Sequence, residues 1–298
     1  MMGTRVLLLI LDGLRCDVAQ SLMGYLAHYL ENNQASFYRV QAELPTLSRP
    51  LYEVLLTGTP VSVNGIGSND VVRLSHQQSL FHLTQAAGLV TAAAAYSWFS
   101  ELYNRVPFEP WRDRNQHSLD LPIQHGCFYW EDSYPDSHLL ADAEMLRQAH
   151  APDFMLVHPM GIDNAGHCYG ADTPDYRGQV LATDSLLARY LPIWRDAGYT
   201  VLITADHGMN ADGQHGGVLP NVRDVPLFCF GEAFVPGKYL EGISQLAIAP
   251  LICHLLGIPP ADAMQRIFVP GYRPWSQEPS PSPSFTPPIP LTASLPSS

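Results

Sequence analysis

The sequence predicts an α/β sandwich built around a mostly parallel central sheet. Short runs of aliphatic and β-branched residues alternate with longer stretches of helical periodicity along most of the chain. Several short runs are apolar without interruption, which is typical of strands covered by helices on both faces. Such alternation favours parallel strands joined by helical crossovers. With 298 residues, 46% of them hydrophobic, the chain can bury a large core, which excludes disorder over most of its length.

Six strands are expected from these runs. The first is an apolar stretch that ends at Asp12, and the fourth and fifth strands are similarly apolar. In chain order the expected strands cover residues 5–12, 36–44, 91–96, 153–160, 200–206 and 225–231. Because the carboxyl ends of parallel strands carry the ligand sites of such sheets, the residues that follow these strands are the first candidates for function.

Five longer helices are expected between the strands. Asp136 and Ser137 are suitable N-terminal caps for the third helix, and Gly257 can end the last one. In chain order the expected helices cover residues 18–32, 78–87, 137–150, 174–195 and 242–257, and a shorter helix-like run covers 51–56.

We expect one catalytic domain over residues 1–272. Within it, the segment 97–135 lacks clear periodicity and carries nine aromatic residues. It is either an excursion that covers the substrate or an irregular insertion with a small core of its own. Residues 273–298 are rich in proline and serine and are predicted to be a disordered tail without a catalytic role.

The charge of the chain limits its partners. Sixteen basic residues against 28 acidic ones give a net charge of −12, which argues against nucleic-acid duplexes and anionic membranes. A small anionic substrate would need a positive group other than Lys or Arg, and a metal ion is such a group. Five scattered cysteines without a CxxC pair indicate a reducing compartment. The apolar run 6–11 is too short to span a membrane and lacks a signal-peptide cleavage site, so we expect a cytoplasmic protein.

Three carboxylates and three imidazoles follow the first, fourth and fifth predicted strands. They are Asp12, Asp163, His167, Asp206, His207 and His215. Singly, each has an ordinary explanation as a turn, capping or surface residue. Their joint position at strand ends favours a metal centre instead. Mixed oxygen and nitrogen ligands suit zinc or manganese, and six ligands are too many for one tetrahedral ion, so two adjacent metal ions are predicted.

The segment after the second strand offers a hydroxyl group. Thr46 and Ser48 precede the helix-like run, where the helix dipole and free backbone N–H groups favour an anion. Either residue can be a nucleophile, or simply the N-terminal cap of the helix.

Taken in order, these motifs resemble the alkaline phosphatase superfamily, most closely its nucleotide pyrophosphatase/phosphodiesterase branch. The carrying segments are Leu8-Leu-Ile-Leu-Asp12-Gly, Pro45-Thr-Leu-Ser48-Arg-Pro50, Asn64-Gly-Ile66 with Asn69, Asp163-Asn-Ala-Gly-His167 and Asp206-His207-Gly-Met209 with His215. The resemblance covers roughly residues 5–231. It implies an alkaline-phosphatase-like three-layer sandwich with helices on both faces of the sheet.

The resemblance also implies roles for individual residues. Ser48 is implied as the nucleophile, and Asn69 as a hydrogen-bond donor to a phosphoryl oxygen. Arg49 is either a contact to the phosphate or an outward-facing surface residue. One metal ion would be held by Asp12, Asp206, His207 and the Ser48 oxygen, and the second by Asp163, His167 and His215. The resemblance implies zinc, with manganese as the alternative.

The implied activity is a two-metal phosphodiesterase or nucleotide pyrophosphatase that acts on a small phosphoester through a phosphoseryl intermediate. Alternatives in the same superfamily are a phosphomonoesterase, a phosphonate hydrolase and a phosphotransferase. A metal-binding protein without catalysis is the alternative from another class. His215 follows His207 by only eight residues, a spacing that resembles the phosphoethanolamine-transferring relatives.

Other features narrow the choice within the superfamily. Arg49-Pro-Leu-Tyr52 replaces the Phe-Pro-Asn-His that is common in the phosphodiesterase branch, so the leaving-group pocket differs. No Cys/Ser-x-Pro-x-Arg motif is present, which argues against a formylglycine sulfatase.

Overall fold

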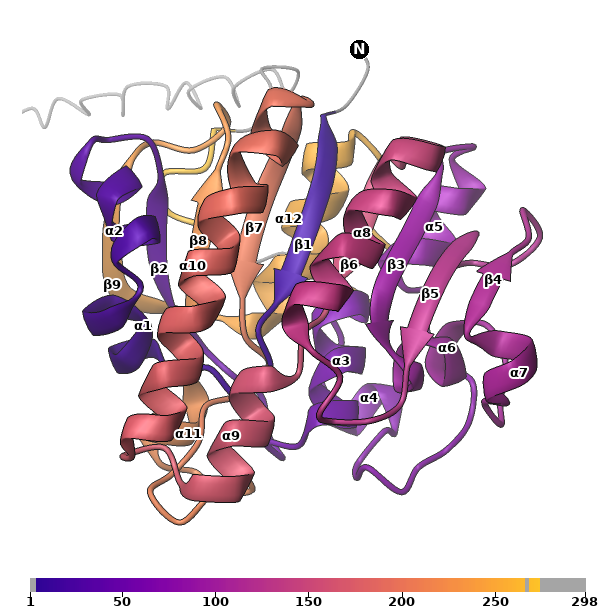
Figure 1. Ribbon diagram of the computed structural model, residues 1–298. Coiled ribbons are helices and arrows are strands. Elements are labelled where there is room, and N and C mark those ends of the chain that lie inside the picture. Colours follow the sequence, from indigo (N-terminus) through magenta and orange to yellow (C-terminus); the bar gives the residue numbers. More distant parts are fainter. Residues whose placement is uncertain (1–3, 266–267, 274–298) are drawn as a thin grey trace, which may run out of the picture.

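A computed structural model describes residues 4–265 and 268–273 of the chain (Figure 1). This part contains a nine-stranded sheet. The strands are β1 (Arg5–Ile10), β2 (Ser36–Gln41), β3 (Thr91–Tyr96), β4 (Asn115–His117), β5 (His125–Tyr129), β6 (Phe154–Val157), β7 (Tyr199–Thr204), β8 (Asp224–Phe230) and β9 (Gly237–Ser244). Their order across the sheet is β4-β5-β3-β6-β1-β7-β8-β2-β9. The expected tail lies outside the described residues from position 274 onward.

Most neighbouring strands are parallel, as the sequence predicts. Strand β1 is parallel to β6 and β7, β3 is parallel to β5 and β6, and β9 is parallel to β2. The pairs β4–β5, β7–β8 and β2–β8 are antiparallel. In the centre of the sheet, Leu8 stands opposite Leu156 on one side and Leu202 on the other. The uninterrupted apolar run of β1 is buried on both faces, because helices cover both sides of the sheet.

Helices cover both faces of the sheet and complete a three-layer sandwich. They are α1 (Cys16–Leu22), α2 (Gly24–Glu31), α3 (Ser48–Thr57), α4 (Val61–Asn64), α5 (Leu80–Ala86), α6 (Ser97–Tyr103), α7 (Pro110–Asp113), α8 (Asp136–His150), α9 (Gly161–Tyr169), α10 (Pro174–Asp196), α11 (Pro220–Arg223) and α12 (Ile248–Leu256), with a 3-10 turn η1 (Gln245–Ala247). Figure 1 shows α8 and α10 in front of the sheet and α5 and α12 behind it. The expected three-layer α/β fold is confirmed.

The prediction of a single helix over residues 18–32 is wrong, because the structure divides this segment into α1 and α2 at Met23. The Asp184 carboxylate on α10 accepts hydrogen bonds from the backbone N–H groups of Tyr25 at 2.8 Å and Leu26 at 3.3 Å. A partner from another helix therefore satisfies the first N–H groups of α2. The sequence pattern of the segment does not reveal this long-range contact.

The segment 97–135 belongs to the sheet and is not a separate insertion. It contributes α6, α7, the edge strand β4 and its neighbour β5. These strands were not expected, because they are short and carry polar residues such as His117 and His125. Whether this segment covers a bound substrate stays a prediction.

The helix predicted over residues 242–257 begins too early. Residues up to Ser244 form the edge strand β9, and the Ser244 hydroxyl accepts a hydrogen bond from the Leu246 N–H, which starts the turn before α12. Among the described residues, no helix is both long enough and apolar enough to cross a bilayer.

Candidate active site

The six predicted metal ligands meet at the carboxyl ends of the central strands. Asp12 follows β1, helix α9 after β6 carries Asp163 and His167, and Asp206 with His207 follows β7. They form two groups, and within each group the ligand atoms lie within 4.8 Å of one another. The first group is Asp12, Asp206 and His207, and the second is Asp163, His167 and His215. Segments far apart in the sequence are therefore brought together at one edge of the sheet.

The first group is completely buried, and the predicted nucleophile lies beside it. His207 Nε2 lies 3.2 Å from Asp206 Oδ2 and 3.5 Å from Asp12 Oδ1. The Ser48 hydroxyl, on the first residue of α3, lies 3.1 Å from the same His207 nitrogen. The structure thus places the Ser48 oxygen beside the three side chains that are predicted to share a metal ion with it.

The second group adjoins the first. His167 Nε2 lies 3.4 Å from Asp163 Oδ2 and 3.2 Å from His215 Nε2. The rings of His215 and His207 stack with centroids 3.7 Å apart and planes inclined by 7°. Two neighbouring ligand groups in contact suit a pair of ions that act on one substrate.

Each of the three histidines is oriented by a backbone carbonyl. The Nδ1 atoms lie within hydrogen-bond distance of carbonyl oxygens, which fixes Nδ1 as the protonated nitrogen and leaves the Nε2 lone pair free. The pairs are His167 with Gly213 at 2.8 Å, His207 with Gly208 at 2.9 Å and His215 with Thr46 at 2.7 Å. All three free lone pairs belong to the nitrogens that face the carboxylates or one another.

The carboxylates also fit divalent metal ions. Asp12 Oδ1, Asp163 Oδ1 and Asp206 Oδ2 are buried and have no hydrogen-bond partner among the described residues. Burial and the neighbouring carboxylates raise the pKa of Asp163 and of Asp206 well above the ordinary value. Burial and the charge of His215 lower the pKa of His207 to about 3, so its imidazole is neutral. Orphaned carboxylate oxygens and neutral imidazoles are the ligands that zinc-class ions require.

Two buried residues that the sequence analysis missed hold Asp12 in place. His158 Nε2 lies 3.0 Å from Asp12 Oδ2, and the Tyr52 hydroxyl donates to the same oxygen. Burial alone would raise the pKa of Asp12, but the hydrogen bond from His158, the adjacent His207 ring and the Tyr52 hydroxyl outweigh it and lower this pKa. Position in the sequence was an available signal, since His158 follows β6 directly and Tyr52 lies one turn after Ser48.

Asn69 and Arg49 lie next to Ser48 with different contacts. Asn69 Oδ1 accepts a hydrogen bond from the Arg49 backbone N–H at 3.0 Å, which leaves the Asn69 NH₂ group as a donor. The Arg49 side chain is only 2% exposed, so the alternative of an outward-facing arginine is wrong. Its guanidinium lies 2.6 Å from the Glu101 carboxylate and 4.5 Å from the centre of the Trp98 ring.

The other candidate hydroxyl has a structural role. Thr46 donates to the carbonyl oxygens of His215 and Gly217, which fixes the loop that carries His215. The structure therefore places the Ser48 hydroxyl, and not the Thr46 hydroxyl, beside the free ring nitrogen of a predicted ligand, His207.

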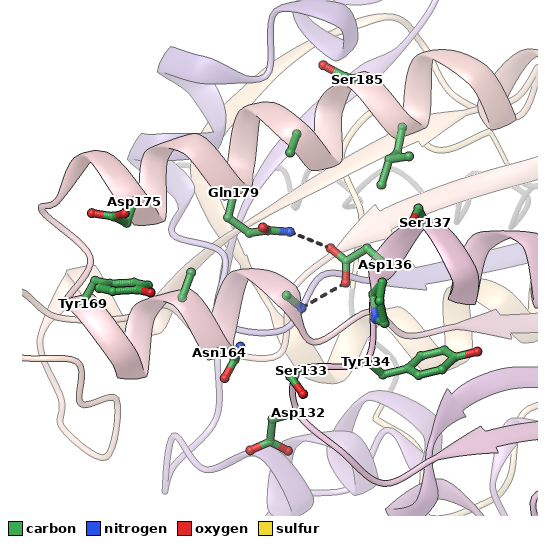
Figure 2. Close-up of a pocket in the computed structure, with 15 residues that line it drawn as sticks. Asp132, Ser133, Tyr134, Asp136, Ser137, Asn164, Tyr169, Asp175, Gln179 and Ser185 are labelled. Carbon is green, nitrogen blue, oxygen red and sulfur yellow. Dashed lines mark hydrogen bonds between the residues drawn. The ribbon is translucent and has the colours of Figure 1, made fainter.

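A cavity of about 750 Å³ runs along α8, α9 and α10 (Figure 2). Its lining residues on α9 are Gly161, Asn164, Ala165 and Tyr169, which centre on the side of the helix away from Asp163 and His167. Asp136 accepts hydrogen bonds there from the Gly161 N–H at 3.1 Å and from Gln179 at 3.0 Å. Asp136 thereby fixes the start of the helix that carries Asp163 and His167.

Comparison with curated proteins gives relatives that transfer ethanolamine phosphate, according to their names. The catalytic subunit of mouse GPI ethanolamine phosphate transferase 3 is 24% identical over 284 residues, which cover 86% of this chain and 24% of the mouse protein. GPI ethanolamine phosphate transferase 2 of Schizosaccharomyces pombe is 29% identical over 150 residues, which cover 43% of this chain and 20% of the yeast protein. The chain thus spans about a quarter of the length of these relatives.

Solved structures and a family model agree with the fold. Murine ectonucleotide pyrophosphatase/phosphodiesterase 5 superposes with a TM-score of 0.69 at 14% identity, covering 87% of this chain and 96% of the murine one. A 2-O GAG sulfatase superposes with a TM-score of 0.62 at 14% identity, covering 88% and 72%. The model of type I phosphodiesterase/nucleotide pyrophosphatase matches residues 6–216. The chain therefore belongs to the type I phosphodiesterase/nucleotide pyrophosphatase family of the alkaline phosphatase superfamily.

Proposed function

We propose that this chain cleaves small phosphodiesters in two steps, with Ser48 as the nucleophile. The observation that carries the proposal is the position of the Ser48 oxygen, 3.1 Å from His207 Nε2 and beside the buried group of Asp12, Asp206 and His207. In the first step the Ser48 oxygen forms a bond to phosphorus and the ester alcohol leaves. In the second step water takes the phosphoryl group from Ser48 and restores the hydroxyl.

The two ligand groups supply the sites for the metal ions that this chemistry needs. Two divalent ions, zinc in our proposal, would lower the pKa of the serine hydroxyl and polarise the phosphoryl group. Asp12, Asp206, His207 and Ser48 would hold one ion, and Asp163, His167 and His215 the other. The orphaned carboxylate oxygens and the oriented imidazoles support this assignment.

The donor that we assign to the substrate phosphate is Asn69. In the first turn of α3, the Arg49 N–H is used by Asn69 Oδ1 and Pro50 has no N–H group. The Asn69 NH₂ group remains as a donor, and the contact of Asn69 Oδ1 with the residue after Ser48 orients it. Arg49 is a weaker candidate for a second phosphate contact, because its charge is paired with Glu101.

Transfer to an alcohol is the second candidate function, with phosphoethanolamine as the group carried. Two observations favour it. The curated relatives are named GPI ethanolamine phosphate transferases, and His215 follows His207 by the eight residues that resemble this branch. In this case an acceptor hydroxyl, and not water, takes the phosphoryl group from Ser48. The first step and its residues are the same for both candidates.

Rates on two synthetic esters test the proposal. We expect the chain to hydrolyse bis(p-nitrophenyl) phosphate faster than p-nitrophenyl phosphate, with zinc or manganese added, and to lose the activity in chelator. Faster monoester hydrolysis would contradict the diester preference and favour a phosphomonoesterase with Arg49 at the phosphate. Turnover that persists in chelator would contradict the metal centre.

Product analysis separates hydrolysis from transfer. The p-nitrophenyl ester of phosphoethanolamine is offered with and without glycerol, and the phosphorus products are identified by mass spectrometry. Free phosphoethanolamine in both samples supports the hydrolase. Accumulation of the phosphoethanolamine ester of glycerol supports the transferase, provided that p-nitrophenol is released at the same rate with and without glycerol.

We further propose a small phosphoester as the partner, rather than a nucleic-acid duplex or an anionic membrane surface, and the cytoplasm as the location. The net charge of −12 supports the first statement. The five free cysteines, four of them buried, support a reducing compartment.

A further inference from the structure

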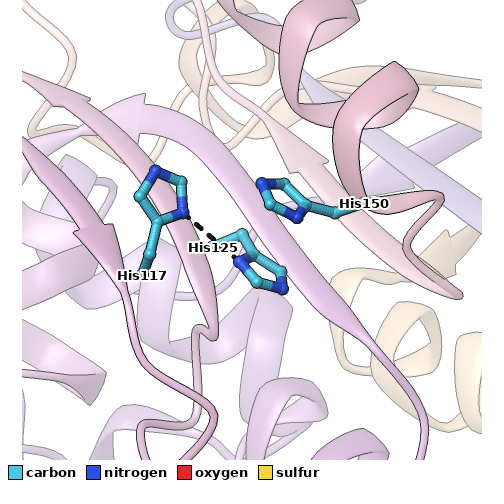
Figure 3. Close-up of side chains that lie close together, drawn as sticks. All are labelled: His117, His125 and His150. Atoms are coloured by element: carbon cyan, nitrogen blue, oxygen red, sulfur yellow. Dashed lines mark hydrogen bonds between the residues drawn. The ribbon is translucent and has the colours of Figure 1, made fainter.

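Three histidines form a cluster at the far end of the sheet from the candidate active site (Figure 3). His117 ends β4, His125 begins β5 and His150 is the last residue of α8. Strand β5 is parallel to β3, so its first residue lies at the amino ends of the parallel strands. Asp12 and Asp206 follow the carboxyl ends, on the opposite side of the sheet. The cluster is thus separate from the two catalytic ligand groups.

Strand register brings two of the histidines together. His117 and His125 are direct partners in the antiparallel β4–β5 pair, so their side chains point to the same face of the sheet. Helix α8 packs on β3 and β5 and places His150 against His125, with the two rings stacked at 3.6 Å. Figure 3 shows the three rings gathered beside the strand, one from each element.

The distances in the cluster approach those of a metal site. Nδ1 of His117 lies 3.3 Å from Nδ1 of His125. Two nitrogens bound to one zinc ion at about 2.0–2.1 Å in tetrahedral geometry are about 3.4 Å apart. All three residues offer a ring nitrogen within 4.8 Å of the others. His150 would turn out of its stack on His125 to direct a ring nitrogen to the same ion, because the lone pairs of stacked rings lie in parallel planes.

The electrostatic setting keeps these imidazoles available as ligands. Burial together with the charges of His150 and His117 lowers the pKa of His125 to about 4. Burial and His117 also lower the pKa of His150. Neutral rings carry the lone pairs that a metal ion needs. His150 lies at the C-terminal end of a 15-residue helix, whose negative dipole end favours a cation.

We propose that His117, His125 and His150 form a third metal site, which binds Zn²⁺ or another imidazole-preferring ion such as Ni²⁺ or Cu²⁺. Three protein ligands leave a position for solvent. The ion would link the short edge strand β4, its partner β5 and the end of α8. Its role in this position is structural, because the cluster lies at the opposite edge from Ser48.

Zinc content tests the proposal in the full chain without a histidine tag. Metal-stripped protein is dialysed against buffered Zn²⁺, and bound zinc per chain is measured by elemental analysis. We compare the original chain with His125→Ala and with His150→Gln, which changes a half-buried residue at a helix end. His138→Ala is the control, since His138 is an exposed histidine on the same helix.

The expected result is a loss of about one zinc per chain in His125→Ala and in His150→Gln, and no loss in His138→Ala. This difference does not depend on whether the catalytic centre binds two ions. The test of the third site is therefore separate from the test of the proposed function. Diester hydrolysis is expected to be unchanged in all three variants. Equal zinc content in the original chain, His125→Ala and His150→Gln, all folded by circular dichroism, overturns the proposal.

Discussion

Ser48 differs from the neighbouring Thr46 in what its hydroxyl group contacts. Thr46 donates to two backbone carbonyls, whereas the Ser48 oxygen faces His207 at the border of the ligand groups. Replacement of Ser48 by alanine removes the proposed nucleophile without removing a carboxylate or an imidazole. We therefore expect Ser48→Ala to lower kcat at least about a hundredfold while the zinc content changes little.

The control for this variant is Ser185→Ala, which changes an exposed serine on α10. Steady-state rates on bis(p-nitrophenyl) phosphate and elemental analysis are measured for both variants. A Ser48→Ala enzyme with near-normal turnover, together with an inactive Thr46→Ala enzyme, would show that the nucleophile is assigned to the wrong residue.

A substitution of Tyr52 tests whether its hydroxyl supports Asp12 as a metal ligand. Its hydroxyl donates to Asp12 Oδ2, and its ring packs against Phe99 and His158. Tyr52→Phe removes the hydrogen bond and keeps the ring. We expect zinc to bind the catalytic centre about 10–100-fold more weakly, measured by competition with a chelator. Tyr38→Phe is the matched control, because it removes another buried hydroxyl, which donates to the Pro270 carbonyl. Equal zinc affinity in both variants would exclude this role for Tyr52.

The grouping of the candidate ligands could be predicted from sequence, but the contacts of the residues that support them could not. Asp12 and Asp206 directly follow apolar strands, and this position gives a charged side chain at the sheet edge. His158 also follows a strand, but its role depends on a single contact with Asp12 across the sheet. Arg49 is charged and was open to a surface position, while its burial depends on Glu101 and Trp98 from a helix that the sequence did not predict.

At the scale of the element, α3 is notable because all ten of its residues are buried. Glu53 in its middle accepts hydrogen bonds from Tyr103 at 2.8 Å and from Ser75. Burial raises the pKa of Glu53 to about 7, although these two hydrogen bonds oppose the shift. The folded state therefore binds a proton more tightly at this carboxyl than the unfolded state does.

This shift predicts a loss of stability with rising pH. The unfolded carboxyl loses its proton near 4.5 and the folded one near 7, so the free energy of unfolding falls between these values by about 3 kcal/mol. Glu53→Gln is expected to remove most of this fall. Urea unfolding at pH 5 and pH 8 measures it, with the exposed Glu31→Gln as control. A variant with the same pH dependence as the original chain would contradict the assignment to Glu53.

Strands were predictable where burial on both faces makes them continuously apolar. Strands β1, β6 and β7 in the middle of the sheet follow this pattern. The edge strands β4 and β9 do not, since solvent reaches them and their sequences are mixed. Strand β5 is buried but carries His125 and Gly126, which interrupt the apolar pattern. Local patterns therefore predicted the centre of the sheet and missed its edges.

At the scale of the whole molecule, the candidate centre joins segments from most of the chain. Ligands come from the ends of β1 and β7, from α9 and from the loop that carries His215. Bound metal ions would therefore stabilise the folded state as a whole, because the unfolded chain does not hold these ligands together.

Metal removal is expected to destabilise the protein more at high pH. Without metal, burial and mutual repulsion raise the pKa of Asp163 and of Asp206, so the folded state takes up protons that the unfolded state lacks. Stability without metal therefore falls as the pH rises, whereas bound ions keep the carboxylates ionised and paired.

Chelator is expected to lower Tm at pH 8 by about 10 °C and to have a smaller effect at pH 5. Thermal unfolding of His125→Ala with and without chelator measures this effect apart from the proposed third site. Equal Tm values with and without chelator at both pH values would show that the six side chains hold no ion.

In the proposed mechanism, the phosphoryl group passes through Ser48. The most direct test is peptide mass spectrometry of the chain after acid quenching during turnover of bis(p-nitrophenyl) phosphate with zinc. We predict a p-nitrophenylphosphoryl or phosphoryl adduct on Ser48, absent when chelator is added before the substrate. An adduct on Thr46 or on another residue, with Ser48 unmodified under the same chelator-sensitive turnover, would contradict the account.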